Sequence, residues 1–158
     1  MSETEAAPSR FPWPPVIYVA LVAVSILAQW LWPLPWIGSP LADLLFALGW
    51  LMAAGAVALD IAAIRTLGRA KTTVMPHRAS EHLVTTGPFA LSRNPIYLGN
   101  TALMVGIGFI AGSLWFVLLA FVAAALTTLL AIRPEERHLA GRFGKRYRDY
   151  ARKVRRWI

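Results

Sequence analysis

The sequence predicts an all-α integral membrane protein with four transmembrane helices and an amphipathic C-terminal helix. Of its 158 residues, 57% are hydrophobic and only 15% are charged, and the mean hydropathy is +0.53. Residues 94–132 contain no charged side chain. As one helix this run would measure about 58 Å, roughly twice the hydrocarbon core of a bilayer, so we expect it to fold back as a helical hairpin.

Four apolar segments of this single domain are the expected membrane spans. Residues 16–32 form the first, and the prolines and glycine of residues 33–40 end it. Residues 41–64 form the second, which is long enough to cross with some tilt. The third and fourth cover about residues 96–110 and 114–132 and are joined by a short Ala-Gly-Ser corner. Four spans place both chain ends on the same side of the membrane.

The basic residues indicate which side that is. Only one of the 16 Lys and Arg residues precedes residue 65, and the others lie in residues 65–93 and 133–158. Basic loops stay in the cytoplasm, so we expect the loop 65–95 and both termini to be cytoplasmic. The first ten residues are acidic and polar, which does not fit a signal peptide. Because the positive charge lies beside apolar segments, we expect membrane lipids as partners and no nucleic acid.

The last 24 residues predict a basic amphipathic helix over residues 135–158. Its apolar residues follow helical spacing and share one face, and Arg and Lys fill the rest. Such a helix lies in the membrane interface and binds anionic lipid. Gly141 and Gly144 weaken a helix, so a close contact or a break is expected there. The residues of the apolar face are Leu139, Phe143, Tyr147, Tyr150 and Val154.

Two polar motifs flank the uncharged run, and the hairpin should bring them together. The first runs from Leu83 to Gly99 and reads LVTTGPF-x3-RNP-x-YLG, and the second is the pair Glu135 and Glu136. The first cannot be a continuous helix, because it contains Gly-Pro and Asn-Pro steps. Irregular backbone near lipid occurs where it is buried in protein or lines a cavity, so this segment is a candidate cavity wall. The alternatives are a plain loop whose Pro95 starts the third helix, and acidic residues that only favour a helix N-terminus.

Taken together, these motifs resemble the isoprenylcysteine carboxyl methyltransferase family and its bacterial members. The pattern LVTTGPF-x3-RNP-x-YLG is followed by two spans and then by EE-x6-FG-x2-Y-x2-Y. More distantly, the chain resembles the phospholipid N-methyltransferases, which share the doubled glutamate. The resemblance covers about residues 65–158, and the first two spans match only as apolar segments.

The resemblance implies an integral membrane enzyme, in the bacterial inner membrane, that uses S-adenosyl-L-methionine. In the family the cofactor is enclosed between the inner ends of the last two spans and the C-terminal helix. Carried over residue by residue, the cofactor-binding positions are Glu81, His82, Leu83, Val84, Phe89, Asn94, Pro95, Ile96, Tyr97 and Glu135.

The chain departs from the best-known members at several of these positions. Phe89 stands where they have Tyr, and Asn94 where they often have His, so a hydroxyl and a titratable group are absent. Glu81 replaces a His, although His82 is adjacent. Ala131 stands where the family has a substrate-contacting Arg, and Arg133 could replace it as the substrate-binding residue.

The expected reaction is methyl transfer to a lipophilic acceptor that enters from the bilayer, most simply a carboxylate of the isoprenylcysteine type. The alternatives are the amine of a phospholipid, or no reaction at all in a small transporter or assembly subunit. A carboxylate acceptor is already ionised at neutral pH, whereas an amine needs a proton acceptor, for which His82, Glu135 and Glu136 are within reach. We expect the glutamates to hold the cofactor instead, and the residues alone assign no catalytic group.

Two further groups of ionisable residues need an interpretation. His77, Glu81 and His82 match no metal-ligand spacing, and the chain has no cysteine, so no metal is expected. Asp60 lies near the end of the second span, where an ionisable residue can mark an ion or proton path. Because Arg65 is close in sequence, we interpret Asp60 as paired or capped at the interface.

Overall fold

The computed structural model describes residues 12–70 and 83–158, and every regular element in those residues is helical. The cofactor positions predicted at Glu81 and His82, and also His77, lie outside the described residues. The elements are α1 (Trp13–Leu31), α2 (Leu41–Arg69), the 3₁₀ turn η2 (Gly87–Ala90), α3 (Pro95–Ala111), α4 (Leu114–Thr127), the π-helical turn η3 (Thr128–Ile132), α5 (Arg133–Phe143) and α6 (Lys145–Lys153).

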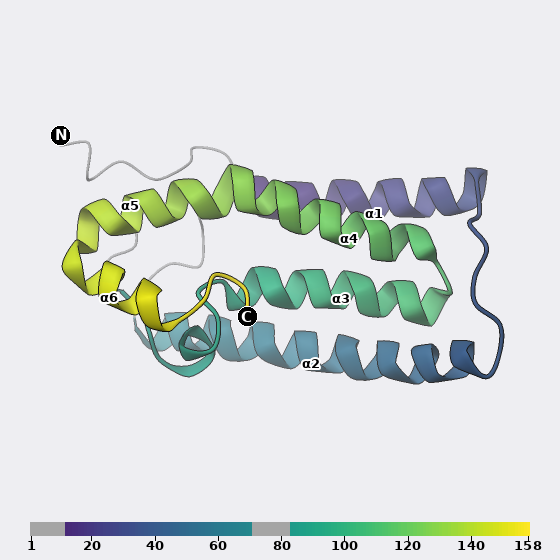
Figure 1. Ribbon diagram of the computed structural model, residues 1–158, viewed down its shortest axis with the longest axis horizontal. Coiled ribbons are helices and arrows are strands. Elements are labelled where there is room, and N and C mark those ends of the chain that lie inside the picture. The colour runs from purple at the N-terminus through teal and green to yellow at the C-terminus, as the bar shows by residue number, and fades with distance from the viewer. Residues whose placement is uncertain (1–11, 71–82) are drawn as a thin grey trace.

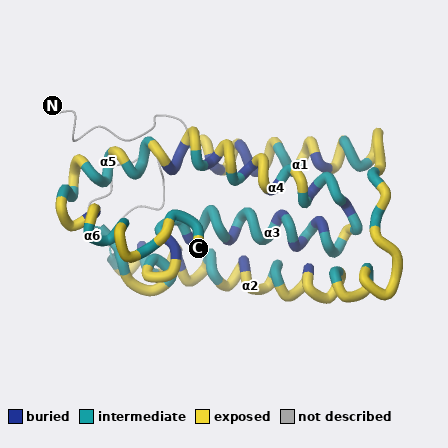
Figure 2. The backbone as a smooth tube through the Cα atoms, viewed as in Figure 1, coloured by how far each residue is buried: buried dark blue, intermediate teal, exposed yellow. Residues whose placement is uncertain are grey.

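The long helices lie side by side in the order α1, α4, α3, α2 (Figure 1). Buried residues are distributed along the helices and alternate with exposed ones (Figure 2). Many large apolar side chains are exposed, among them Trp30, Leu51 and Phe121. Among the described residues, three helices are long and apolar enough to cross a membrane: α1, α2 and the continuous helix Leu114–Phe143. Helix α3 is apolar as well, with 17 residues. This arrangement fits a membrane protein, in which apolar side chains face lipid.

Small residues allow α2 and α3 to pack closely. A Cβ atom on Gly49 of α2 would lie 2.7 Å from the backbone oxygen of Gly106, and one on Gly106 of α3 would lie 2.9 Å from the backbone oxygen of Gly49. Ala56 and Ala63, on α2, are buried. Helices in lipid associate mainly through such close backbone packing, because lipid chains are as apolar as the side chains.

The uncharged run folds back as predicted. Gly112 ends α3 with φ +61°, a left-handed conformation that favours glycine, and α4 starts two residues later. The Ser113 hydroxyl hydrogen-bonds to the Gln29 side chain over 2.8 Å, which ties this turn to the end of α1. The hairpin therefore returns residue 133 to the end of the molecule where α3 begins (Figure 1).

The tail predicted as one helix over residues 135–158 forms two helical segments, α5 and α6, with the break at Gly144, one of the two glycines where a break was expected. The helix that begins at Leu114 continues to Phe143 and includes Pro134, which has no N–H for a helical hydrogen bond. The π turn η3 lies directly before Pro134, and in it the N–H of Arg133 is bonded to the Thr128 carbonyl five residues earlier. The break comes at Gly144, whose φ is +53°, and the short helix α6 then folds back (Figure 1).

Candidate functional site

The two polar motifs meet at the end of the hairpin, as the uncharged run predicts. Arg93, in the first motif, forms an ion pair with Glu136, and its Nη1 atom lies 3.1 Å from Glu136 Oε1. Glu136 also accepts two hydrogen bonds from Arg156, with Nε 2.9 Å from Oε1 and Nη2 2.6 Å from Oε2. One glutamate on α5 is thus held by arginines from two other segments, in the bidentate geometry that favours an Arg–carboxylate pair.

The residues after α6 return to the first motif and bind its backbone. The backbone N–H of Arg93 donates to the Arg155 carbonyl over 3.0 Å. The Asn94 side chain donates to the Arg156 carbonyl over 2.9 Å, and the buried Ser92 hydroxyl donates to the same carbonyl over 3.3 Å. The chain end therefore forms a strap across residues 92–94, at the start of α3.

Two tyrosines of α6 complete this assembly. Tyr147 is buried, and its hydroxyl accepts a hydrogen bond from Arg93 Nη1 over 3.1 Å. The Tyr150 hydroxyl donates to the Phe89 carbonyl over 2.6 Å. Burial raises the pKa of both phenols, so both stay neutral at physiological pH and act as hydrogen-bonding groups. Helix α6 is fixed in this way to the middle of the first motif, at Phe89 and Arg93.

Glu135 has a different environment from Glu136. Its carboxyl group lies next to the Tyr97 side chain of α3, and its Oε2 atom is buried without a hydrogen-bond partner. Two other side chains of this end of the molecule also have a buried nitrogen without a hydrogen-bond partner: His138, three residues further along the same helix, at Nε2, and Arg93 at Nε. A buried polar atom without a partner is costly in a folded protein, so each of these atoms is a candidate contact for a ligand.

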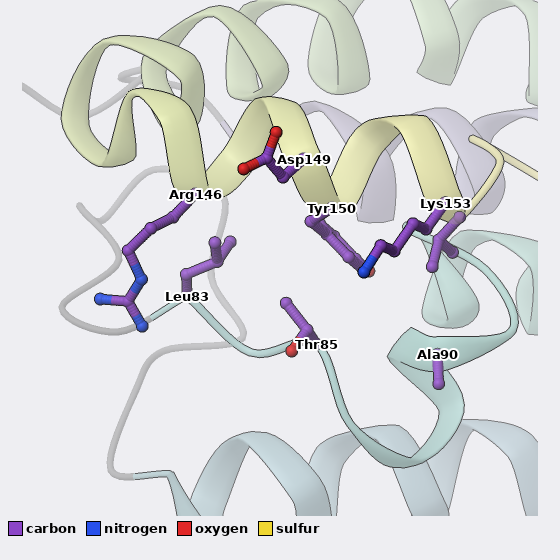
Figure 3. A pocket seen from close by; sticks show the side chains of 8 residues that line it. Leu83, Thr85, Ala90, Arg146, Asp149, Tyr150 and Lys153 are labelled. Carbon is purple, nitrogen blue, oxygen red and sulfur yellow. The ribbon is translucent and has the colours of Figure 1, made fainter.

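A cavity of about 440 Å³ lies between the first motif and α6 (Figure 3). This volume is within the range of small-molecule sites. Figure 3 shows Tyr150 and Lys153 on the α6 side, and Thr85 and Leu83 on the opposite wall. The lining residues are Leu83, Thr85, Ala90, Arg146, Asp149, Tyr150, Lys153 and Val154.

The predicted site residues are divided between the surroundings of Glu135, the C-terminal strap and the cavity. Tyr97 and Glu135 contact each other, Asn94 binds the C-terminal strap, and Leu83 lines the cavity. Phe89 contributes its carbonyl to Tyr150. The other described members lie in the same segments: Val84 and Ile96 are half-buried and Pro95 is buried.

Arg133, the predicted substrate contact, is exposed, while Ala131 is buried at 3% exposure. Arg93 and Arg156 are the guanidinium groups that bind Glu136. Sequence reasoning did not select Arg156, because ten basic residues follow residue 132 and nothing in their spacing distinguishes it. It also missed His138, although the spacing of three from Glu135 on one helix was a usable signal.

The interpretation of Asp60 as a partner of Arg65 is wrong. Residues five apart on a helix point in different directions, and the Asp60 side chain faces α3 at Gly99. A Cβ atom on Gly99 would lie 2.8 Å from Asp60 Cγ, so the absence of a side chain there provides the space for this carboxylate. Asp60 Oδ1 is buried and has no hydrogen-bond partner.

In residues 12–70 and 83–158, no group of three or more His, Asp or Glu side chains is arranged as a metal site. This finding applies to those residues and leaves His77, Glu81 and His82 outside it.

The sequence profile of the phospholipid methyltransferase family matches residues 44–146. Two curated relatives are also similar. The nickel-cobalt-cadmium resistance protein NccN of Alcaligenes xylosoxydans xylosoxydans is 31% identical over 143 residues, which are 90% of this chain and 60% of that protein. The cobalt-zinc-cadmium resistance protein CzcN of Cupriavidus metallidurans is 32% identical over 120 residues, 75% of this chain and 51% of that protein.

The chain therefore spans between about half and three fifths of the length of these two relatives. No solved structure matches it significantly.

Proposed function

Because the chain belongs to the phospholipid methyltransferase family, we propose that it transfers a methyl group from S-adenosyl-L-methionine to a lipophilic acceptor at the membrane. The observation that carries this proposal is the junction of the two motifs. There Glu136 is fully engaged by two arginines, while Glu135 keeps a buried oxygen without a partner. The acceptor would enter from the bilayer, along the apolar helices.

The residues at the junction fit this cofactor. When bound, S-adenosyl-L-methionine supplies an electrophilic methyl group on a sulfonium. Its amino acid portion carries one ammonium and one carboxylate, which match the free oxygen of Glu135 and the free Nε–H of Arg93. His138 Nε2 offers a further polar contact. The remaining members of the proposed cofactor set are Glu81, His82, Leu83, Val84, Phe89, Asn94, Pro95, Ile96 and Tyr97.

Positioning and exclusion of water are what this site can contribute to methyl transfer. Holding two reactants in line can supply a large part of the rate of a displacement reaction. The ion pairs of Glu136 fix α6 and the C-terminal strap over the start of α3, which would keep water from the reacting groups. Tyr97, whose side chain lies next to Glu135, would orient its carboxyl group.

The charges around the junction favour an amine acceptor over the isoprenylcysteine carboxylate that the motifs first indicate. A carboxylate acceptor needs a free cation. Ala131 is buried at the position where isoprenylcysteine carboxyl methyltransferases have a substrate-contacting arginine, and Arg133 is exposed. Arg93 and Arg156 already bind Glu136. We therefore propose the amine of a phospholipid as the acceptor, with the carboxylate as the alternative.

For the membrane arrangement we propose that α3 crosses the bilayer together with the three longer helices. Its 17 residues would span about 26 Å, close to the thickness of the hydrocarbon core. The chain would lie in a bacterial inner membrane with both termini in the cytoplasm. The reason is that nearly all of its basic residues lie in residues 65–93 and 133–158, and basic segments stay on the cytoplasmic side. Membrane lipids are then its natural neighbours.

A second candidate function is a non-catalytic subunit of a metal-resistance system. It is favoured by the names of the two relatives, which are called metal resistance proteins. A subunit of this kind would need neither S-adenosyl-L-methionine nor a free oxygen on Glu135.

Calorimetry with S-adenosylhomocysteine and the detergent-purified protein separates the two candidates. We expect binding by the parent protein, at least tenfold weaker binding by Glu135→Gln, and unchanged binding by Asp43→Asn, which alters an exposed carboxylate at the other end of α2. A parent protein that does not bind would refute the methyltransferase proposal. Labelling membranes with a methyl donor then identifies the acceptor, because methyl esters are cleaved by base and methylamines are not.

A further inference from the structure

The cavity between the first motif and α6 is lined by two cations that form no ion pair in the described part of the chain. Arg146 and Lys153, both exposed, line it from α6. The ion pairs of the described residues use Arg93, Arg152 and Arg156 instead. The α6 wall of the cavity therefore offers positive charge to a ligand that carries negative charge.

The two cations are placed to act together. They are seven residues apart on α6, so they share one face of the helix, with a separation of about 10 Å along its axis. Figure 3 shows them toward the two ends of the α6 wall, with Tyr150 between them. Both are long, flexible side chains that can turn toward a group bound between them. Asp149 is the one carboxylate among the described lining residues, and it is already paired with Arg152 at 3.9 Å.

The opposite wall of the cavity is neutral and mostly apolar. Leu83, Thr85 and Ala90 of the first motif form it, and Val154 adds a further apolar side chain just after α6. The Thr85 hydroxyl can donate a hydrogen bond to an oxygen of a ligand. An anion that also has an apolar part suits these surroundings better than a free inorganic ion, which makes no use of the apolar wall.

The cavity also lies at the level where a bilayer has its phospholipid headgroups. Ala90 precedes the start of the apolar helix α3 by five residues, and Val154 directly precedes the strap over residues 92–94. Because α3 enters the bilayer at Pro95 in the proposed arrangement, the cavity is close to the headgroup layer at the ends of the spans. Basic segments at this level attract anionic lipid.

The cavity is distinct from the proposed cofactor junction. The residues with unpartnered buried atoms at the junction, Glu135, His138 and Arg93, are not among those that line the cavity. Tyr147, which bonds to Arg93 at the junction, is adjacent to Arg146 in sequence. Adjacent residues of a helix point about 100° apart, so α6 presents one side to the junction and another to the cavity.

We propose that this cavity binds the phosphate headgroup of an anionic membrane phospholipid, with Arg146 and Lys153 as the cations that hold it. A headgroup bound there would contact both α6 and the first motif, and would stabilise the docked position of α6 and of the strap. Helix α6 has five Lys or Arg residues and one Asp, so a zwitterionic headgroup would bring a further cation into a basic environment. A lipid of net negative charge is therefore favoured. This inference goes beyond methyl transfer and does not depend on it.

The test compares two doubly substituted proteins that lose the same charge. Arg146→Gln/Lys153→Gln removes the cations of the cavity, whereas Lys145→Gln/Arg148→Gln removes two exposed cations of the same helix that are not among its lining residues. Gln is about as good a helix former as Lys or Arg, so both proteins should keep α6. Binding of dioleoyl phosphatidylglycerol and of dioleoyl phosphatidylcholine is titrated by native mass spectrometry of the detergent-purified proteins.

We expect Arg146→Gln/Lys153→Gln to bind phosphatidylglycerol about tenfold or more weakly than the parent, because each basic residue near the headgroups contributes to the attraction. Lys145→Gln/Arg148→Gln should stay within about threefold of the parent, since exposed charges away from the ligand are screened by salt. Phosphatidylcholine should bind weakly to all three proteins. S-adenosylhomocysteine affinity should be the same in all three.

Hydrogen exchange in nanodiscs tests the effect on the strap. In the parent protein, the Arg93 amide, which donates to the Arg155 carbonyl, should exchange severalfold more slowly in phosphatidylglycerol than in phosphatidylcholine. This difference should persist in Lys145→Gln/Arg148→Gln and disappear in Arg146→Gln/Lys153→Gln.

Four results would overturn the lipid site. An equal loss of phosphatidylglycerol affinity in both doubly substituted proteins would show a non-specific attraction between a basic helix and lipid, and equal affinity of the parent for both lipids would remove the role of net charge. Displacement of the lipid by an equal concentration of inorganic phosphate would assign the cavity to a free phosphate. Weaker S-adenosylhomocysteine binding in Arg146→Gln/Lys153→Gln alone would assign the cavity, with Leu83, to the cofactor. A parent protein that does not bind S-adenosylhomocysteine would refute the proposed function and leave this inference standing.

Discussion

Replacing Glu136 with Gln is expected to release the C-terminal strap from the first motif. The substitution keeps the size of the side chain but removes the charge that binds Arg93 at 3.1 Å and Arg156 at 2.6 Å. Arg93 is 14% exposed and Glu136 is 17% exposed, so Arg93 would be left as a largely buried cation without its anion. The affected contacts are those of α6 and the residues after it.

The size of the effect follows from the burial of each partner. Removing one member of a buried ion pair costs about 3–5 kcal/mol. The pair here is not fully buried, and Arg156 is 36% exposed, so solvent screening reduces its share to below about 1 kcal/mol. We therefore expect a loss of about 3 kcal/mol in the docking of the strap, or about a hundredfold in its opening equilibrium.

Hydrogen exchange followed by mass spectrometry measures this opening. The amide of Arg93, which donates to the Arg155 carbonyl, should exchange about a hundredfold faster in Glu136→Gln, while amides in the middle of α2 and α3 keep their protection. Asp149→Asn is the control, because its pair with Arg152 is long, at 3.9 Å, and exposed. Equal exchange at residues 92–94 in the parent and Glu136→Gln would refute the role given to this ion pair.

Three other substitutions test the packing and the site. Gly99→Ala places a methyl group against Asp60 and should destabilise the protein by about 1–3 kcal/mol in thermal unfolding. Gly144→Ala puts a side chain at φ +53° and should cost about 1–2 kcal/mol, whereas Gly141→Ala, in open space on a helix, should gain up to about 1 kcal/mol. Tyr97→Phe removes the hydroxyl group next to Glu135 and should weaken S-adenosylhomocysteine binding by about tenfold or more in calorimetry.

Each of these has a result that would count against it. Gly55→Ala is the control for Gly99→Ala, because a Cβ atom at Gly55 meets nothing within 4 Å, and equal melting temperatures for the two variants would contradict the contact with Asp60. If Gly144→Ala and Gly141→Ala had the same stability, the break between α5 and α6 would not depend on the conformation of Gly144. A Tyr97→Phe protein with full affinity would show that Glu135 needs no help from Tyr97.

The helices and the meeting of the motifs could be predicted because they depend on features that are local in sequence. The length of the uncharged run requires a fold-back within a bilayer, and the ion pair of Arg93 with Glu136 is the result. That the tail continues the fourth span without interruption could not be predicted, because Pro134 is usually a helix boundary and the π turn before it has no sequence signal.

Long-range partners could not be predicted for a related reason. Asp60 was assigned to Arg65 because only neighbours along the helix are visible in the sequence, whereas its actual neighbour, Gly99, has no side chain to suggest a contact. In the sequence, Arg156 could not be distinguished from the other arginines of the tail. Its contact with Glu136 depends on the fold of the C-terminal strap. A glycine at the end of a motif was the available signal for close approach of another helix.

The two glutamates of the doubled motif have different roles because adjacent residues on a helix point about 100° apart. Glu136 faces the strap and the first motif, and all of its hydrogen-bonding partners are protein groups. Glu135 lies next to Tyr97 of α3, and its Oε2 is buried without a hydrogen-bond partner. Glu136→Gln should therefore open the strap, and weaken ligand binding only through that opening, whereas Glu135→Gln should weaken binding with the strap still protected. Faster exchange at residues 92–94 in Glu135→Gln, at the level seen in Glu136→Gln, would show that the pair acts as one structural unit and would remove the main argument for a ligand at Glu135.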